Sequence, residues 1–387
     1  MYKVLKLNNI ASEGIDSFPP DNYIVSDDIT NPDAIILRSF NMHSMEIPLS
    51  LKAVGRAGSG FNNIPIKKLS AMAIPVFNAP GANSNAVKEL VIASILISAR
   101  NIHQAIEFVE KSKNPDDFNQ QIEKVKNKYV GYELPGKTIG VIGLGAIGVK
   151  VANACLNLGM KVVGFDPMMT VNNAWELQPG IENSNNLVNL LKQSDVITIH
   201  IPSTDETRNF IGRDELSIMK DNVTLINLSR AEIINNDAIT SSLTENRIKT
   251  YITDFPDKSL IGRSNVLLLP HLGASTQEAE TKCAKMVTRS IRSYLENGNI
   301  YNSVNFPNVH LDKKIGSRLS VINHNQPNMV GQFTTCLGEA GININDLSHK
   351  NYKEIGYTLI DIDKLATTEI LEKILQIDGV VSIKNIN

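Results

Sequence analysis

The sequence of 387 residues is poor in cysteine and has no long apolar run, and both absences narrow the possibilities. Cys155, Cys283 and Cys336 are odd in number and far apart, which argues against a disulfide framework and a metal knuckle and favours a cytoplasmic protein. No stretch approaches the roughly 18 apolar residues of a membrane span, and the first residues lack the apolar core of a secretory signal. We therefore expect no metal and no membrane partner.

An excess of one charge sign is also missing. Lys and Arg together number 38 and Asp and Glu 40, which gives a net charge of −2. Nucleic-acid-binding proteins usually carry a basic excess, so this balance argues against a nucleic-acid partner. Hydrophobic residues make up 42% of the chain, which is enough to build a globular core.

Short apolar segments alternate with helical patterns along most of the chain, and this alternation predicts an α/β protein with parallel sheets. About 150 residues per domain gives two to three domains. From residue 136 to about 270 the alternation is regular, as in a Rossmann-type doubly wound sheet. Residues 316–387 instead follow the order βαββαβ, which is the ferredoxin-like arrangement.

The segment Gly143-Leu-Gly145-Ala-Ile-Gly148 matches the dinucleotide motif G-x-G-x-x-G. It follows a predicted strand and opens a predicted helix, and this context makes the match specific. Gly143 permits the tight turn, Gly145 lets the backbone approach a pyrophosphate, and Gly148 lets helix and strand pack closely. The amides of Ala146 and Ile147 would then face the phosphates from the helix N-terminus.

An acidic residue follows the motif at the expected distance. Asp166 ends the next predicted strand. It lies close to the position, ~20 residues past the glycines, at which an acidic residue that contacts the ribose is expected. Its carboxylate can accept hydrogen bonds from both ribose hydroxyls and would repel a 2′-phosphate. The sequence therefore predicts NAD, in preference to NADP, as the cofactor.

Several polar residues follow later predicted strands, where open α/β sheets bind ligands. Arg230 could hold a 2-oxo acid carboxylate through its planar guanidinium. His271 has the side chain suited to exchanging a proton with the carbonyl or hydroxyl at the reacting carbon. Asp254 could bond the nicotinamide carboxamide. His200 is more typical of a structural histidine, with at most a cofactor contact.

The segments GVIGLGAIG, NLSRAEIIN and PHLGAST together resemble the D-isomer-specific 2-hydroxyacid dehydrogenases. Segments beginning at Arg56, Asn78 and Asn302, with the C-terminal unit, are similar to the short phosphoglycerate dehydrogenases of that family, which carry an ACT domain. The resemblance implies NAD-dependent oxidation of 3-phospho-D-glycerate to 3-phosphooxypyruvate, the first step of L-serine biosynthesis. It also implies a flavodoxin-like substrate-binding domain (1–99 and 280–305), a Rossmann domain (100–279), an ACT-like regulatory domain (316–387) and a homo-oligomer, as a dimer or tetramer.

The resemblance also assigns roles to residues. Arg230 orients the substrate and His271 is the acid/base. The implied NAD contacts are Ser59, Gly143, Gly145, Ala146, Ile147, Gly148, Asp166, His200, Leu228, Ser229, Arg230, Asp254, His271, Leu272, Gly273 and Ala274. The implied substrate contacts are Arg38, Ser39, Ser59, Gly60, Arg230 and His271, with Arg38 as a phosphate ligand.

The sequence departs from the family pattern at two places. The family pairs its histidine with a glutamate, but the corresponding segment reads Asp254-Phe-Pro-Asp257-Lys258-Ser259. We expect Asp257 to replace the glutamate; a one-residue deletion would put Lys258 there instead. In the C-terminal unit, Asn325 and Asn343 match residues that hold the effector L-serine, whereas Asn323 stands where the family has histidine.

Two other functions stay open at this point. One is a sister dehydrogenase acting on glycerate, hydroxypyruvate or D-lactate, which would not need the cation Arg38. The other is an NAD-sensing binding protein that has kept the fold without turnover.

Overall fold

The computed structural model describes residues 1–112, 118–312 and 316–386. By internal contacts the chain forms two compact units. Unit 1 comprises Met1–Asn83 and Thr276–Asn387, and unit 2 comprises Ser84–Ser275. The predicted boundaries at residues 99 and 280 differ from this division, because helix α3 (Ser84–Ala99) lies in unit 2, where it packs on α6 (Gly148–Asn157) and β10 (Val223–Asn227). The three-domain division stays a prediction.

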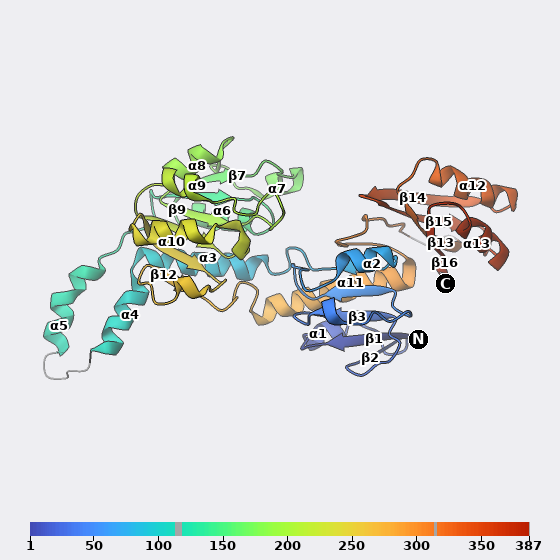
Figure 1. Cartoon of the computed structure of the whole chain (residues 1–387), viewed down its shortest axis with the longest axis horizontal. Helices are drawn as coiled ribbons and strands as arrows, with labels where there is room; N and C mark the ends of the chain where they lie inside the picture. Colours follow the sequence, from blue (N-terminus) through green and yellow to red (C-terminus); the bar gives the residue numbers. More distant parts are fainter. Residues whose placement is uncertain (113–117, 313–315, 387) are drawn as a thin grey trace. The chain divides into compact units, whose positions relative to one another are not determined.

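The first sheet of unit 1 is parallel and has the strand order β2-β1-β3-β4-β5, which is the flavodoxin-like order (Figure 1). Its central strand β3 consists of AIIL, fully buried as expected for a strand covered on both faces. Helix α11 (Gln277–Asn297) returns from the end of unit 2 and packs on β4. The other elements here are β1 (Tyr2–Leu7), α1 (Ser12–Ile15), β2 (Tyr23–Ser26), β3 (Ala34–Leu37), η1 (Met42–Ser44), β4 (Ala53–Arg56), α2 (Ile66–Ala71) and β5 (Val76–Phe77).

Unit 2 contains a seven-stranded parallel sheet with the order β12-β11-β10-β9-β6-β7-β8. Counted from β6, this is the Rossmann order 3-2-1-4-5-6 with one further strand at the edge. The strands are β6 (Thr138–Ile142), β7 (Lys161–Phe165), β8 (Glu182–Asn183), β9 (Val196–Ile199), β10, β11 (Ile248–Thr253) and β12 (Val266–Leu268). The helices besides α3 and α6 are α4 (Ile102–Lys111), α5 (Phe118–Val125), η2 (Lys126–Tyr129), α7 (Val171–Glu176), α8 (Leu187–Gln193), α9 (Arg213–Ile218), η3 (Ala231–Ile233), α10 (Asn236–Thr244) and η4 (Lys258–Leu260).

The C-terminal part of unit 1 confirms the predicted βαββαβ order. Its antiparallel sheet has the order β14-β15-β13-β16, as in the ferredoxin-like fold. The elements are β13 (Ser317–His324), α12 (Met329–Glu339), β14 (Ile344–Tyr352), β15 (Ile355–Ile362), α13 (Thr368–Leu375) and β16 (Val380–Ile386).

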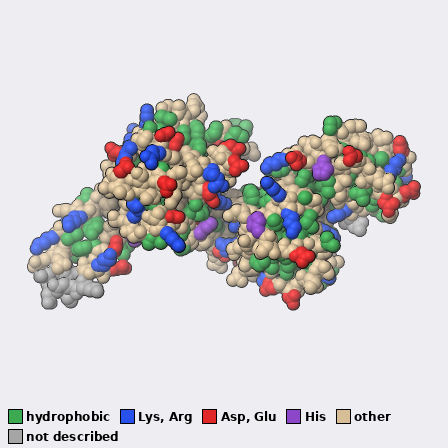
Figure 2. All heavy atoms as spheres, viewed as in Figure 1, with side chains coloured by type: hydrophobic (Ala, Val, Ile, Leu, Met, Phe, Trp, Pro, Cys, Tyr) green, Lys and Arg blue, Asp and Glu red, His purple; other side chains and the backbone are tan. Residues whose placement is uncertain are grey.

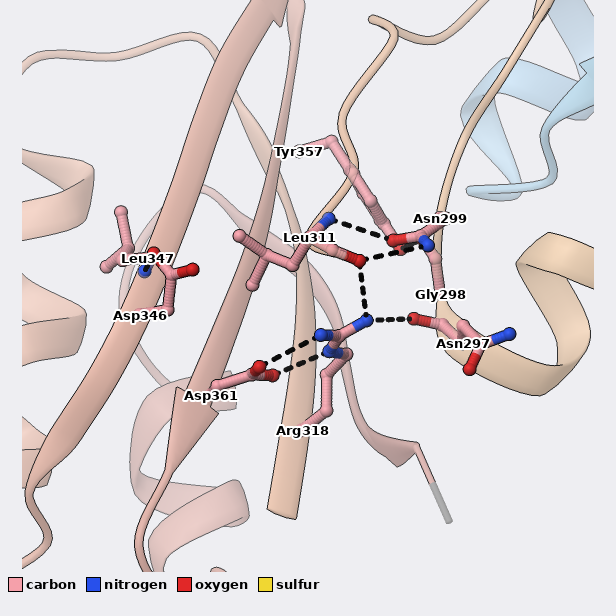
Figure 3. Close-up of polar contacts among 9 residues, drawn as sticks. All are labelled: Asn297, Gly298, Asn299, Leu311, Arg318, Asp346, Leu347, Tyr357 and Asp361. Carbon is pink, nitrogen blue, oxygen red and sulfur yellow. Dashed lines mark hydrogen bonds and ion pairs between the residues drawn. The ribbon is translucent and has the colours of Figure 1, made fainter. Parts of the chain in front are cut away.

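A buried ion pair ties this C-terminal sheet to the end of α11 (Figure 3). Arg318 and Asp361 are both 0% exposed and share two hydrogen bonds, of 2.6 Å (Nε to Oδ1) and 2.9 Å (Nη2 to Oδ2). The remaining nitrogen of Arg318 donates to the carbonyls of Asn297 (3.2 Å) and Leu311 (3.3 Å). Tyr357 also donates to the Gly298 carbonyl, over 2.6 Å. The C-terminal sheet and α11 are therefore fastened by polar contacts as well as by the shared apolar core.

Acidic and basic side chains are interspersed over the face shown in Figure 2, in keeping with the balanced composition. In the described ranges, no helix is both long and apolar enough to cross a membrane. The same residues contain no cluster of His, Cys, Asp and Glu side chains that could hold a metal ion.

Candidate active site

The glycine-rich turn of unit 2 has the geometry that the motif predicts. Gly143 lies at the end of β6 with φ +89, and a Cβ there would come within 2.6 Å of the His200 carbonyl oxygen. A Cβ on Gly148 would come within 1.9 Å of the Gly143 carbonyl oxygen, so only glycine lets α6 begin this close to the strand. No atom lies within 4 Å of a Cβ built on Gly145. This open side is where a pyrophosphate could approach the backbone.

Asp166, which follows the neighbouring strand β7, forms a hydrogen bond with the turn. Its Oδ2 accepts the Leu144 amide over 2.8 Å, and its Oδ1 accepts the Met168 amide over 2.8 Å. Each carboxylate oxygen has a second lone pair, so both can still accept a ribose hydroxyl. The carboxylate is thus fixed beside the turn.

All the predicted ligands of unit 2 lie along one edge of its sheet. The strands are parallel, so their carboxyl ends meet at that edge. In spatial order from β12 to β7 the edge carries His271, Asp254, the segment Leu228–Arg230, His200, the glycine turn and Asp166. An extended dinucleotide could therefore contact all of them along one line.

Asp254 is the buried centre of the group next to β11. It is 1% exposed, and its Oδ2 accepts the Gly273 amide over 2.9 Å. Burial raises the pKa of Asp254, and the Gly273 hydrogen bond and the charges of His271 and Arg230 only partly oppose this. Its other oxygen, Oδ1, is buried without a hydrogen-bond partner, and an unsatisfied buried acceptor of this kind suits the amide donor of a nicotinamide.

His271 and Arg230 are held by their backbones on either side of Asp254. The His271 amide donates to the Asp254 carbonyl (3.0 Å) and the Leu269 carbonyl (3.1 Å), and its φ of 52° is unusual for a residue with a side chain. The ring meets Phe255 edge-on, with 5.0 Å between ring centroids. The Arg230 carbonyl accepts from buried Asn227 over 2.9 Å, and its Nη1 donates to the Ser229 carbonyl over 2.6 Å.

Comparison with known proteins agrees with this geometry. Residues 92–273 match the model of the D-isomer specific 2-hydroxyacid dehydrogenase, NAD binding domain. The D-3-phosphoglycerate dehydrogenase of Escherichia coli K12 is 32% identical over 341 residues, covering 84% of this chain and 78% of that protein. The chain belongs to the D-isomer specific 2-hydroxyacid dehydrogenase family.

A further relative and two solved structures are also similar to this chain. The D-3-phosphoglycerate dehydrogenase of Methanocaldococcus jannaschii is 34% identical over 294 residues, covering 74% of this chain but only 54% of that longer protein. Among solved structures, the holo form of Rhodotorula graminis D-mandelate dehydrogenase superposes with a TM-score of 0.68 at 22% identity, over 80% of this chain and 99% of that one. A D-isomer specific 2-hydroxyacid dehydrogenase from Lactobacillus delbrueckii ssp. bulgaricus, in an NAD complexed form, gives 0.64 at 20% identity, over 78% and 100%. These structures establish the fold.

The glutamate that the family pairs with its histidine has no clear equivalent. Asp257 caps η4, and its Oδ1 accepts from the amide (2.9 Å) and the hydroxyl (2.6 Å) of Ser259. These hydrogen bonds lower the pKa of Asp257. None of its described contacts reaches His271, so the pairing stays a prediction.

His200 is better described as a structural residue of the edge. Burial lowers the pKa of His200 to about 3, so its ring is neutral. Nε2 lies 2.9 Å from the Thr198 hydroxyl, and Nδ1 is buried without a partner. The ring could meet a cofactor only through that second nitrogen.

The predicted substrate residues of unit 1 lie in the loops after β3 and β4. Arg38 and Ser39 follow β3 directly, and Ser59 and Gly60 lie in the loop after β4. The Ser59 carbonyl accepts from Asn78 over 2.6 Å. Both loops are at the carboxyl edge of the unit 1 sheet.

Sequence reasoning missed three residues that shape the site. Phe255 packs on the His271 ring, and its only signal was its place just after a strand-ending aspartate. Arg56 is a second arginine at the carboxyl edge of the unit 1 sheet, and Glu280 pairs with Arg38. The segment that begins at Arg56 carries part of the family resemblance, but the sequence assigns no role to Arg56 itself, and Glu280 has no signal because Arg38 is distant along the chain.

Proposed function

We propose that this protein oxidises 3-phospho-D-glycerate to 3-phosphooxypyruvate with NAD, the first step of L-serine biosynthesis. The observation that carries the chemistry is the grouping of Arg230 and His271 around buried Asp254, on the edge that also carries the glycine turn. The substrate is inferred from relatives named D-3-phosphoglycerate dehydrogenase in bacteria and archaea.

In this proposal different residues of unit 2 bind the cofactor, orient the substrate and transfer the proton. Bound NAD supplies the hydride acceptor, held by the glycine turn, Asp166 and the free oxygen of Asp254. Arg230 binds the substrate carboxylate in a charge-assisted hydrogen bond, which fixes the orientation of C2. His271 takes the proton of the C2 hydroxyl. General acid–base assistance of this type contributes about 10²–10⁴ in rate.

The decisive experiment follows NADH absorbance with 3-phosphoglycerate, D-glycerate and D-lactate as substrates. We expect turnover with 3-phosphoglycerate and a fall of about 10²–10⁴ in kcat for His271→Asn. His324→Asn is the matched control, because His324 is exposed at the end of β13. Preference for an unphosphorylated substrate would identify a sister dehydrogenase, and NAD binding without turnover would identify a sensor.

We also propose Asp257 as the carboxylate partner of His271. Its present hydrogen bonds come from Ser259 and, over 3.5 Å, from Asn236; both residues are exposed, so water can replace them. Loss of a partner that stabilises the imidazolium should lower the pKa on which turnover depends. If Asp257→Asn leaves the pH profile of kcat unchanged, the pairing is wrong.

The proposal extends to assembly and regulation in the cytoplasm. Ile102, Ile106 and Val109 are 39%, 52% and 45% exposed on one face of α4, which suits burial against a second copy of the chain. L-serine as effector would meet Asn325 and Asn343. The Asn325 side chain now donates to the Lys353 carbonyl (3.0 Å), and the Asn343 side chain donates to Asn345 (3.4 Å). Light scattering and serine titration of turnover test the two parts separately.

A further inference from the structure

Two arginines lie at the carboxyl ends of neighbouring strands in unit 1. Arg56 ends β4 and pairs in register with Leu37, the last residue of β3, and Arg38 comes next along the chain. In the order β2-β1-β3-β4-β5 the direction of the strand connections reverses between β1 and β3. Open α/β sheets bind ligands outside the carboxyl ends at such a reversal. Arg38 therefore borders the place in this sheet where a ligand is expected, and Arg56 ends the next strand.

Hydrogen bonds of Asn63 connect the two loops that carry the arginines. Asn63 accepts a hydrogen bond from Arg56 Nε over 3.0 Å and donates to the carbonyls of Arg38 (3.1 Å) and Phe40 (2.7 Å). A Cβ on Gly58 would lie 2.5 Å from Arg56 Nη1, so the guanidinium rests against the loop that continues to Ser59 and Gly60. Because arginine presents a rigid fork of donors, two fixed arginines suit a phosphate.

One of these arginines already forms an ion pair with a carboxylate. Glu280, in the first turn of α11, lies with its Oε1 2.6 Å from Arg38 Nη1. The two side chains are 39% and 32% exposed, so water and solutes can reach the pair. Guanidinium has five N–H donors, and this contact engages only Nη1.

Close packing of α11 brings Glu280 to this position. A Cβ on Gly55 would come within 2.4 Å of Val287 Cγ1, so the glycine in β4 lets the helix approach the strand. One turn after Glu280, Cys283 is buried between helix and sheet. Burial raises the pKa of this thiol; Arg38 and Arg56 oppose the rise, and Glu280 adds to it. All three charges therefore act on this thiol.

We propose that Glu280 is an internal competitor at the phosphate contact that the family resemblance implies for Arg38, so that a phosphorylated substrate must displace Glu280 from Arg38. The inference rests on the proposed function. A phosphate monoester carries about −1.5 to −2 charge at pH 7, so it attracts the guanidinium more strongly than one carboxylate does. Glu280 lowers the affinity for such a substrate and thereby sets its KM. D-glycerate has no phosphate and leaves the ion pair undisturbed.

The test compares Glu280→Gln with Glu278→Gln. Both variants remove one negative charge from the first turn of α11, but only Glu280 pairs with Arg38. We expect Glu280→Gln to lower the KM for 3-phosphoglycerate about two- to fivefold, the range that an exposed ion pair supports. The KM for D-glycerate and the values for Glu278→Gln should stay at those of the unchanged protein. An unchanged KM in Glu280→Gln would show that Glu280 does not compete with the phosphate, and a higher KM would show that Glu280 positions Arg38 for it; either result overturns the proposal.

Inorganic phosphate gives a readout that does not depend on turnover. If Glu280 competes for the site, phosphate should raise the Tm of Glu280→Gln at lower concentrations than it does for the unchanged protein or Glu278→Gln. Equal responses of the three proteins would contradict the competition. Absence of turnover with 3-phosphoglycerate in the unchanged protein would overturn the proposed function alone, because the phosphate titration still reports on the ion pair.

Discussion

Two arginine–carboxylate pairs of unit 1 have the same chemistry and opposite surroundings. Arg318 and Asp361 are 0% exposed and joined by two hydrogen bonds, whereas Arg38 and Glu280 are about one-third exposed and joined by a single ion-pair contact. A buried pair loses all its hydration, so each partner depends on the other. An exposed pair can exchange its partner for water or for an incoming anion. The first pair is therefore suited to holding the fold and the second to binding.

The largest expected effect comes from breaking the buried pair. Arg318→Leu removes the guanidinium that pairs with buried Asp361 and also removes the donor to the Asn297 and Leu311 carbonyls. We expect the free energy of unfolding, measured by urea denaturation, to fall by about 3–5 kcal/mol.

Removing both charges of this pair is the control. The double variant Arg318→Leu with Asp361→Leu has no buried charge left, so we expect it to be more stable than Arg318→Leu alone. A loss below about 1 kcal/mol in the single variant would place the pair in the same class as exposed ion pairs.

An intermediate effect is expected at the exposed pair, and on a different property. Arg38→Ala should change the free energy of unfolding by no more than about 1 kcal/mol. The KM for 3-phosphoglycerate should rise about tenfold to a hundredfold, because a charge-assisted hydrogen bond contributes about 1.5–3 kcal/mol. The KM for D-glycerate serves as the internal control and should stay the same. A rise for both substrates would mean that Arg38 supports the site without touching the phosphate.

The pattern of apolar residues and glycines within short segments was sufficient to predict much of the fold. Ala34–Leu37 is a short apolar run of the kind that predicts a buried strand, and it forms β3 with the same ends, because four apolar residues between turns have few alternatives. The glycine turn was equally predictable, since its spacing is set by contacts within one strand–turn–helix unit. Edge strand β8 was missed because it consists of two exposed polar residues, which leave no apolar pattern to detect, and edge strand β2 was missed because it is only four residues long and partly exposed.

The charged contacts could not be predicted in the same way. Arg318 reads in the sequence as an ordinary residue after a linker, and its burial depends on the end of α11 and on β15. Glu280 meets Arg38 only because α11 returns to pack on β4. Such pairs are decided by tertiary packing between segments far apart in the chain, which residue type and spacing do not encode.

Asp254 extends the comparison to a buried carboxylate that has no ion-pair partner among the described contacts. Asp361 shares its charge with a guanidinium, whereas Asp254 accepts one amide and keeps one oxygen without a hydrogen bond. Burial raises the pKa of Asp254, so the folded protein binds this proton more tightly than the unfolded chain does. Its contribution to stability is therefore fully present below the ordinary pKa of aspartate and is lost as the pH rises through the raised value.

The smallest expected effect follows from this pH dependence of the contribution that Asp254 makes to stability. Asp254→Asn keeps an acceptor for the Gly273 amide and removes the buried charge, so at pH 7 and without NAD the variant should be slightly more stable, by no more than about 1 kcal/mol. Towards acid pH the two proteins should converge, as thermal unfolding between pH 3 and 8 would show. Asp257→Asn is the matched control with the opposite sign, because Ser259 lowers the pKa of exposed Asp257 and its contribution is lost as the pH falls. If Asp254→Asn were instead less stable at pH 7, with the gap closing in acid, the ionised carboxylate would be a net stabiliser, and the nearby charges of Arg230 and His271 would outweigh its burial.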